Sequence, residues 1–180
     1  MSWTIDSSHT RAVFSVRHLM IARVHGLFEK LEGTVDFNPD DLTLSSADVR
    51  IDAASITIRD PNRDAHLKSP DFLDAERYPY LYFKSQRLEI VDESHARLFG
   101  DLTIRDVARP VTFDVEYNGT VKNPWGKTVA GFTASTKINR KDWGLNWNVA
   151  LETGGWLVDD IINIDLELEI VEQPEAVAVA

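Results

Sequence analysis

The sequence predicts an all-β protein, an eight-stranded antiparallel up-and-down barrel with one or two short helices in its loops. The clearest indication is the segment 162–170, in which every second residue is a large aliphatic one and those between are polar. Side chains on a strand point alternately to opposite faces, so this segment is a strand with one dry face and one wet face. A sheet that is wet on one side is usually antiparallel.

About eight such segments follow one another along the chain, and most of the connections between them are as short as those of hairpins. They cover residues 10–18, 24–37, 47–53, 80–91, 97–105, 111–117, 127–138 and 156–171. An even number of strands lets the last pair antiparallel with the first, which leaves no open edge. A closed barrel of this size either fills its centre with its own side chains or holds one small ligand, and the pattern leaves both possibilities open.

The segment 24–37 changes its parity halfway. Its apolar residues share one face up to Phe28 and the opposite face from Leu31 onward. Two strands joined by a turn would explain the change, but residues 29–32 are poor turn formers. We therefore favour one long strand with a β-bulge near Lys30, since a bulge also reverses the parity.

The connections include one long segment, residues 59–79, which we expect to hold a short helix. Asp60 can cap that helix and Pro61 suits its first position. Successive loops of an up-and-down barrel alternate between its two ends. One end then receives residues 17–23, 59–79, 105–110 and 139–155, whereas the other receives residues 38–45, 92–96 and 118–126.

Composition narrows the classes of function. The chain has 180 residues, of which 43% are hydrophobic, and suits a single domain over residues 1–172 with a flexible tail at 173–180. Its net charge of −10 argues against binding to nucleic acid or nonspecifically to anionic membranes. It has no cysteine, no run of transmembrane length and no signal peptide, so we expect a cytoplasmic protein without stable membrane insertion, unless a leader has been removed.

The loops assigned to the first end of the barrel are rich in cations and aromatic residues. They hold ten of the 19 basic residues but only eight acids, together with His18, His66, Trp143 and Trp147. A cationic, aromatic mouth above an apolar lumen suits an amphiphile with an anionic or polar head group. Alternatively, loop arginines pair with loop aspartates and nothing binds. The interpretation also depends on 24–37 being one strand, because two strands would move the loop 17–23 to the far end.

The same loops carry short motifs that jointly resemble those of one family. The matching runs are FSVRHLM at 14–20, VHGLF at 24–28, RDAHLKSPDF at 63–72, YP at 78–79, GDLTIR at 100–105, RPV at 109–111 and NRKDWGL at 139–145. Together they resemble the YceI-like family of lipocalin-like polyisoprenoid-binding proteins. The turn after Arg105 departs from the family pattern, with Asp106 where Gly is expected and Ala108 where Thr is usual.

The resemblance implies a lipocalin-like barrel that binds or transports an isoprenoid, quinone-like or other long-chain amphipathic lipid in its lumen, and it implies a homodimer. We expect the lumen to be lined by Phe14, Val16, Phe28, Phe83, Leu102, Ile104, Phe113, Phe132, Ile138, Trp143, Trp147 and Ile164. We expect the lipid head group to meet Arg17, His18, Arg63, His66 and Arg140. Each buried CH₂ of such a lipid contributes about 0.8 kcal/mol, so several isoprene units suffice for useful affinity.

Catalysis is the weaker interpretation. No pair of histidines has the spacing of metal ligands, and the chain contains neither a nucleophile elbow nor a glycine-rich phosphate loop. We therefore predict no catalytic residues, no metal site and no cofactor. The alternatives are an enzyme that modifies a prenyl lipid through His18 or His66, and a packed barrel that acts only through protein contacts.

Overall fold

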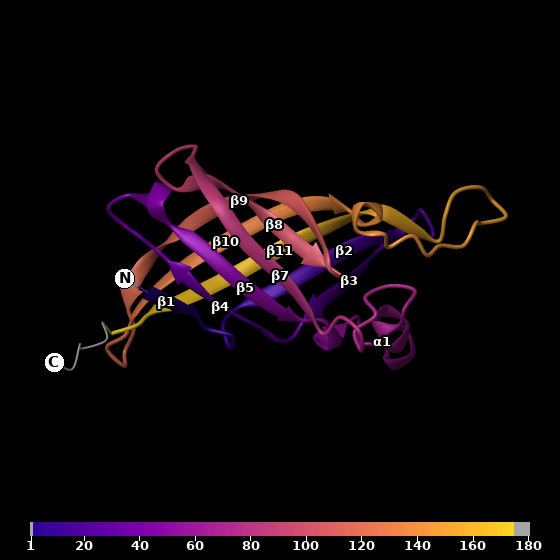
Figure 1. The fold of residues 1–180 in the computed structure, drawn as a ribbon, viewed down its shortest axis with the longest axis horizontal. Coiled ribbons are helices and arrows are strands. Elements are labelled where there is room, and N and C mark those ends of the chain that lie inside the picture. Colours follow the sequence, from indigo (N-terminus) through magenta and orange to yellow (C-terminus); the bar gives the residue numbers. More distant parts are fainter. Residues whose placement is uncertain (1, 175–180) are drawn as a thin grey trace.

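The chain forms a closed antiparallel β-barrel with one short α-helix, as the sequence predicts (Figure 1). The computed structural model describes residues 2–174. Its strands are β1 (Ser2–Ile5), β2 (Arg11–His18), β3 (Ala22–Phe28), β4 (Leu31–Asp36), β5 (Ser46–Asp52), β6 (Ile56–Thr57), β7 (Tyr80–Ile90), β8 (His95–Ile104), β9 (Val107–Lys122), β10 (Thr128–Asn139) and β11 (Val158–Glu172). The helices are α1 (Pro61–Lys68) and the 3-10 turns η1 (Leu42–Leu44), η2 (Ala53–Ser55) and η3 (Arg140–Trp143).

The 11 strand segments form eight barrel strands, because three barrel strands are each interrupted and consist of two segments. β1 and β2 both pair antiparallel with β11, so they form one interrupted strand. β3 pairs with β2 and β4 pairs with β1, so β3 and β4 form the second interrupted strand. β5 pairs with β4 and the short β6 pairs with β3, so β5 and β6 form the third. The pairing of β11 with β1 and β2 closes the sheet on itself, so neither the first nor the last strand is left as an open edge.

The parity change in the second barrel strand has the predicted cause. β3 and β4 run in the same direction, and the ladder is interrupted between them at Glu29 and Lys30. There the N–H of Glu29 donates to the carbonyl of Ser55 and the N–H of Lys30 to the Ser55 hydroxyl, at 3.2 and 3.1 Å. The interpretation as one long strand with an irregularity near Lys30 is confirmed, and the alternative of two strands joined by a turn is wrong.

The predicted length of β9 is wrong. This strand begins at Val107 and continues to Lys122, so the expected turns at 105–110 and 118–126 shrink to tight hairpins. The proline at 110 misled the prediction. Pro110 pairs with Asp101 of β8, but on its other side β9 has no partner, because pairing with β10 begins only at Asp114 and Ser135. A strand tolerates proline at such an edge position.

The helix α1 forms where the sequence predicts it. The carboxylate of Asp60 accepts the backbone N–H groups of Asn62 and Arg63, each at 3.1 Å, and Pro61 occupies the first turn. The carboxylate of Asp64 then accepts the Thr57 hydroxyl and the Ile58 N–H, both at 2.7 Å. These bonds fix the helix against β6, at the end of the barrel.

The four connections assigned to one end do meet there. His18 at the end of β2 pairs with Val158 at the start of β11. The guanidinium of Arg105 donates to the carbonyl of Phe72 at 3.1 Å, and that of Arg109 to the carbonyl of Asp142 at 3.1 Å. In Figure 1 this end holds α1 and the orange loop before β11, and the N-terminus lies at the opposite end. We call it the mouth end.

Gln173 follows β11 and hydrogen-bonds β1 through Ser2 and Thr4. Residues 175–180 of the predicted tail lie outside the described residues.

Candidate functional site

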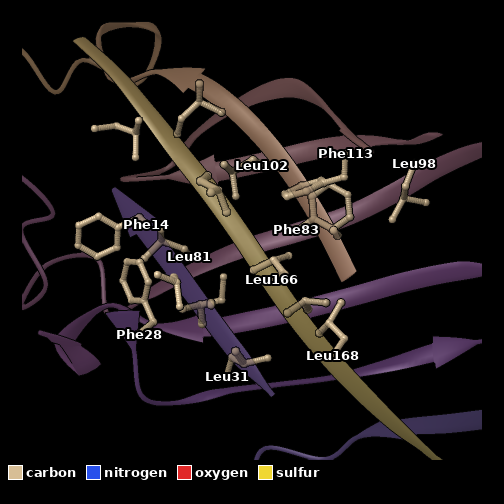
Figure 2. Close-up of a pocket in the computed structure, with 18 of the residues that line it drawn as sticks. Phe14, Phe28, Leu31, Leu81, Phe83, Leu98, Leu102, Phe113, Leu166 and Leu168 are labelled. Carbon is tan, nitrogen blue, oxygen red and sulfur yellow. The ribbon is translucent and has the colours of Figure 1, made fainter. Parts of the chain in front are cut away.

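The barrel is hollow. Its interior holds a cavity of about 480 Å³, which lies within the ~300–1,000 Å³ typical of small-molecule sites. The wall is almost entirely aliphatic and aromatic, and side chains converge on it from both sides of the barrel (Figure 2). Such a lining cannot hydrogen-bond a polar ligand along its length, so the cavity suits a hydrocarbon chain.

Most of the residues predicted to line the lumen do lie on this wall. They are Phe14, Val16, Phe28, Phe83, Leu102, Ile104, Phe113, Phe132, Ile138, Trp147 and Ile164. The strand register explains their convergence, because inward residues of neighbouring strands lie opposite one another: Phe14 pairs with Ile164, and Phe83 with Leu102. Phe83 also meets Phe113 edge to face, with ring centroids 5.2 Å apart (Figure 2).

Trp143 is the one predicted lumen residue that does not line the cavity. Its side chain is buried, and its indole N–H donates to the carbonyl of Leu102 at 2.9 Å. β9 and β10 separate beyond Asp114 and Ser135, and Trp143 follows β10 on the 3-10 turn η3 beside this gap. The structure therefore places Trp143 in the wall of the barrel, where it seals the separation of the two strands.

Other wall residues were missed by the sequence analysis. Those on strands include Leu31, Val49, Leu81 and Leu166, and their alternation with polar neighbours could have identified them. Phe72 and Leu145 also line the cavity but belong to irregular loops. Nothing periodic in the sequence marks such loop residues as inward-facing.

An aromatic cluster closes the mouth end around the cavity. The imidazole of His66 on α1 stands edge-on to the indole of Trp147, with ring centroids 4.5 Å apart. Phe72 contacts both, at centroid distances of 5.1 Å to His66 and 5.3 Å to Trp147. These contacts join the connection that holds α1 and Phe72 to the loop before β11, so they hold the loops of the mouth together.

Arg140 is the buried cation of the mouth. Its side chain lines the cavity and the residue is only 2% exposed. The guanidinium donates to three backbone carbonyls, those of Leu145 at 2.7 Å, Trp147 at 2.9 Å and Asp159 at 3.0 Å.

One amino group of this guanidinium, Nη2, is buried without a hydrogen-bond partner in the described chain. The nearest carboxylate, that of Asp160, lies 3.7 Å away. Burial lowers the pKa of Arg140, and the charges of Asp160 and Asp159 partly oppose that shift. A buried cation with an unpaired N–H group costs free energy unless a ligand or a water molecule accepts a hydrogen bond from that group.

The other predicted head-group residues divide into two groups. His18, Arg63 and His66 line the cavity, as Arg140 does. Arg63 lies 3.7 Å from the carboxylate of Asp60, and His66 Nε2 lies 2.9 Å from that of Asp71. Part of the mouth's charge is thus paired internally, as the alternative interpretation expects.

Arg17 belongs to the second group, because it does not line the cavity. It is exposed on β2 directly opposite Arg23 of β3, and by strand alternation both point to the outer face.

The cavity extends from the mouth to the opposite end of the barrel. There it reaches the β7–β8 turn, where Asp92 and Ser94 line it. Hydrogen bonds from the backbone of Ser94 and from the side chain and backbone of His95 lower the pKa of Asp92, which in turn raises the pKa of His95. The wall is therefore apolar in the middle and polar at both ends.

One group of side chains in residues 2–174 has ligand atoms close enough for a metal ion. The atoms of Asp6, His9 and Glu169 lie within 4.8 Å of one another. His9 Nδ1 is 2.9 Å from Asp6 Oδ2 and 3.6 Å from Glu169 Oε1, so the imidazole pairs with both carboxylates when it is protonated. None of them lines the cavity.

Within residues 2–174, no helix combines the length and the apolar composition that crossing a bilayer demands.

Three comparisons place the chain among known proteins. The UPF0312 protein SAS2572 of Staphylococcus aureus (strain MSSA476) is 34% identical over 169 residues, which are 93% of this chain and 96% of that protein. The crystal structure of a Campylobacter jejuni YceI protein is similar with a TM-score of 0.77 at 32% identity, and covers 88% of this chain and 90% of its own.

A polyisoprenoid-binding domain from Saccharophagus degradans is 11% identical and matches with a TM-score of 0.69 over 95% of this chain and 98% of its own, which shows the same fold. The YceI-like domain matches residues 3–170. The sequence resemblance is therefore confirmed, and the chain belongs to the YceI-like family.

Proposed function

We infer that this protein binds a single-chain or prenyl lipid in its barrel and carries it without chemical change. The observation that supports this function best is the apolar cavity of about 480 Å³ with the buried guanidinium of Arg140 at its mouth end. The similarity in fold to a polyisoprenoid-binding domain agrees with an isoprenoid tail.

The energetics favour a long tail over a compact ligand. Each CH₂ group transferred from water to the wall contributes about 0.8 kcal/mol, so ten such groups contribute about 8 kcal/mol. Immobilising the ligand costs a comparable amount. Affinity therefore grows with tail length until the cavity is filled, and short prenyl compounds should bind weakly.

Arg140 would set the orientation of the lipid. Nη2 of Arg140 is buried and has no hydrogen-bond partner in the described chain, with the Asp160 carboxylate 3.7 Å away, whereas the other nitrogens are held by backbone carbonyls. An anionic or carbonyl oxygen of a head group would complete its hydrogen bonding with a charge-assisted bond. His18 and His66 lie at the same end and can supply further polar contacts.

The test is the lipid content of the protein purified from its own host, measured by native mass spectrometry and by analysis of the extracted lipid. We expect about one lipid per barrel. Ala134→Phe places a ring in the lumen, since Ala134 lines the cavity, and should reduce loading strongly. Its control is Ser135→Phe, because Ser135 is the next residue of β10 and is exposed. Equal loading of the two variants would contradict the lumen as the binding site.

The same experiment separates a carrier from an enzyme that acts through His18 or His66. A carrier releases its lipid unchanged, whereas an enzyme converts it and stops doing so in the His→Ala variants while still binding. The homodimer and the cytoplasmic location stay predictions, which light scattering and cell fractionation can check.

A further inference from the structure

The mouth end carries a small group of apolar side chains that face water. They belong to the β2–β3 turn and to the loop before β11, and they are Leu19, Met20, Ile21, Val149 and Trp156. Their exposed fractions range from 40% for Leu19 to 85% for Ile21. We call these five residues the apolar tip. An exposed apolar patch beside a binding cavity indicates a surface that meets another apolar phase.

The two segments that carry the apolar tip lie side by side. The N–H of Leu19 donates to the carbonyl of Leu157 at 2.9 Å, and the N–H of Leu157 donates to that of Val149 at 2.9 Å. A Cβ built on Gly155 would lie 3.1 Å from the Met20 side chain. In Figure 1 the loop before β11 projects beyond the barrel at the mouth end, and these contacts place the β2–β3 turn beside it.

The backbone of the tip is unfavourable for the residues it holds. The N–H of Ile21 donates to the carbonyl of His18 at 3.2 Å, which closes a β-turn whose central residues are Leu19 and Met20. Both have positive φ, 54° and 63°. Hairpin turns of this kind favour Asn-Gly, because large L-residues are strained there. The turn is thus occupied by residues that are both strained and exposed, a combination found where function opposes stability.

Two arginines flank the tip on the β2–β3 hairpin, while the loop before β11 adds one exposed acid, Glu152. The net charge is −10, yet Arg17 and Arg23 lie directly opposite each other on the outer face of this hairpin. Within residues 2–174 neither guanidinium makes a salt bridge. Like charges in opposed positions of a sheet repel one another, so contact with an anionic surface would offset the repulsion between these two guanidinium groups.

We propose that the apolar tip docks reversibly on an anionic lipid bilayer, with Arg17 and Arg23 at the level of the phosphates. Docking in this orientation brings the mouth of the cavity to the bilayer surface. The inference rests on the proposed function, to which it adds the membrane as the source and destination of the lipid. A few apolar side chains beside basic ones are enough for interfacial binding, which buries them only at the depth of the head groups.

A second copy of the chain fits the tip less well. Five side chains on a protruding turn and loop offer far less than the ~800 Å² per partner that a stable dimer buries. A bilayer deforms around a convex tip and needs no matching concave surface.

The test is flotation of the purified protein with vesicles of phosphatidylcholine, with and without phosphatidylglycerol. We expect the wild type to float with the anionic vesicles, and to do so less at high salt. Ile21→Asp should lower the partition coefficient by about tenfold or more, because it replaces an inserted aliphatic side chain by a charge. Arg23→Glu should abolish the preference for anionic vesicles. Trp125→Ala is the matched control, since Trp125 is 82% exposed in the β9–β10 turn at the opposite end.

Either no flotation of the wild type or equal flotation of wild type and Ile21→Asp would overturn the inference. Self-association that the Ile21→Asp change abolishes, without any flotation, would assign the tip to a second copy and would also overturn it. Lipid loading is measured separately by native mass spectrometry. A loaded protein that does not float refutes docking alone, and a floating protein that never carries lipid refutes the proposed function alone.

Discussion

The imidazole of His66 stands edge-on to the indole of Trp147, with ring centroids 4.5 Å apart and an angle of 87° between the planes. His66 lies on α1 and Trp147 on the loop before β11, so this contact joins two segments that are 81 residues apart in sequence and belong to no common sheet. The rings of His66 and Trp147 also border the cavity. These aromatic contacts therefore hold the mouth together with the hydrogen bonds that Arg140 donates to the carbonyls of Leu145 and Trp147.

Replacing His66 by alanine should loosen the mouth without affecting the barrel. We expect the free energy of unfolding to fall by about 1 kcal/mol, the typical value of one aromatic pair. Amide hydrogen exchange should quicken in residues 144–157 and stay unchanged in β7–β9. His25→Ala is the control, because His25 is exposed on β3. Faster exchange throughout the barrel would show that His66 supports the whole fold instead.

Trp143 should matter for stability and not for lipid binding. Trp143→Phe removes the donor to the carbonyl of Leu102 at a buried position, and the unpaired acceptor costs about 1–3 kcal/mol. Urea unfolding measures this loss, with Trp125→Phe as a control that should change nothing, since Trp125 is 82% exposed. The lipid content of Trp143→Phe should equal that of the wild type. A stable variant that binds no lipid would return Trp143 to the lumen, where the sequence analysis placed it.

The barrel could be predicted from the sequence because strand alternation has a period of two and most of the strands have a wet face. The parity change near Lys30 was interpretable for the same reason, since only a local irregularity preserves the strand direction. The helix α1 was predictable from Asp60 and Pro61, which act within one turn. Pro110 was misinterpreted as a turn, because the separation of β9 from β10 is a tertiary feature that no local pattern encodes.

The cavity residues could be predicted from the sequence only where they lie on strands. Phe14 and Ile164 follow the alternation and lie opposite each other on the wall. Phe72 comes from an irregular segment whose position depends on contacts with α1 and the loop before β11, so its inward orientation had no signal. The burial of Arg140 was equally invisible, because its partners are backbone carbonyls, and these carry no sequence information.

The ion pair of Asp6 and His9 should give the unfolding free energy a defined pH dependence. The Ser8 hydroxyl and the His9 imidazole, which both hydrogen-bond Asp6, lower the pKa of its carboxyl to about 2 from its ordinary 3.8. This contribution is present above pH 3.8 and is lost as the pH falls toward 2. Asp6 raises the pKa of His9 above its ordinary 6.5, so that contribution is complete below pH 6.5 and is lost as the pH rises through the folded pKa.

Urea unfolding of the wild type and Asp6→Asn over a series of pH values measures this dependence. The difference between the two proteins should be greatest between pH 3.8 and 6.5 and should narrow on both sides. Asp92 and His95 form a similar pair, but both proteins retain it, so it cancels in the difference. A difference that is constant from acid to alkaline pH would mean that Asp6 acts only by closing its turn with the backbone of Ser8.

A change that relieves the strain of the β2–β3 turn should raise the stability of the protein and weaken its membrane binding. Leu19 and Met20 have φ values of 54° and 63°, which asparagine and glycine adopt with less strain. The double change Leu19→Asn and Met20→Gly should therefore raise the free energy of unfolding by about 1 kcal/mol, since relief of the left-handed strain exceeds the entropy that glycine adds to the unfolded chain. The same change removes two apolar side chains from the tip, so flotation with anionic vesicles should weaken.

Single changes distinguish the effect of backbone strain in this turn from the effect of its exposed apolar side chains. Met20→Gly alone relieves strain at one position and leaves Ile21, which is 85% exposed, in place. Ile21→Ser alters the surface at a position that is not left-handed, so it should weaken flotation with little change in the unfolding free energy. A double variant that is more stable and still floats like the wild type would show that the strained turn serves the shape of the hairpin. Opposite signs for stability and flotation are expected only if its apolar side chains are kept for contact with lipid.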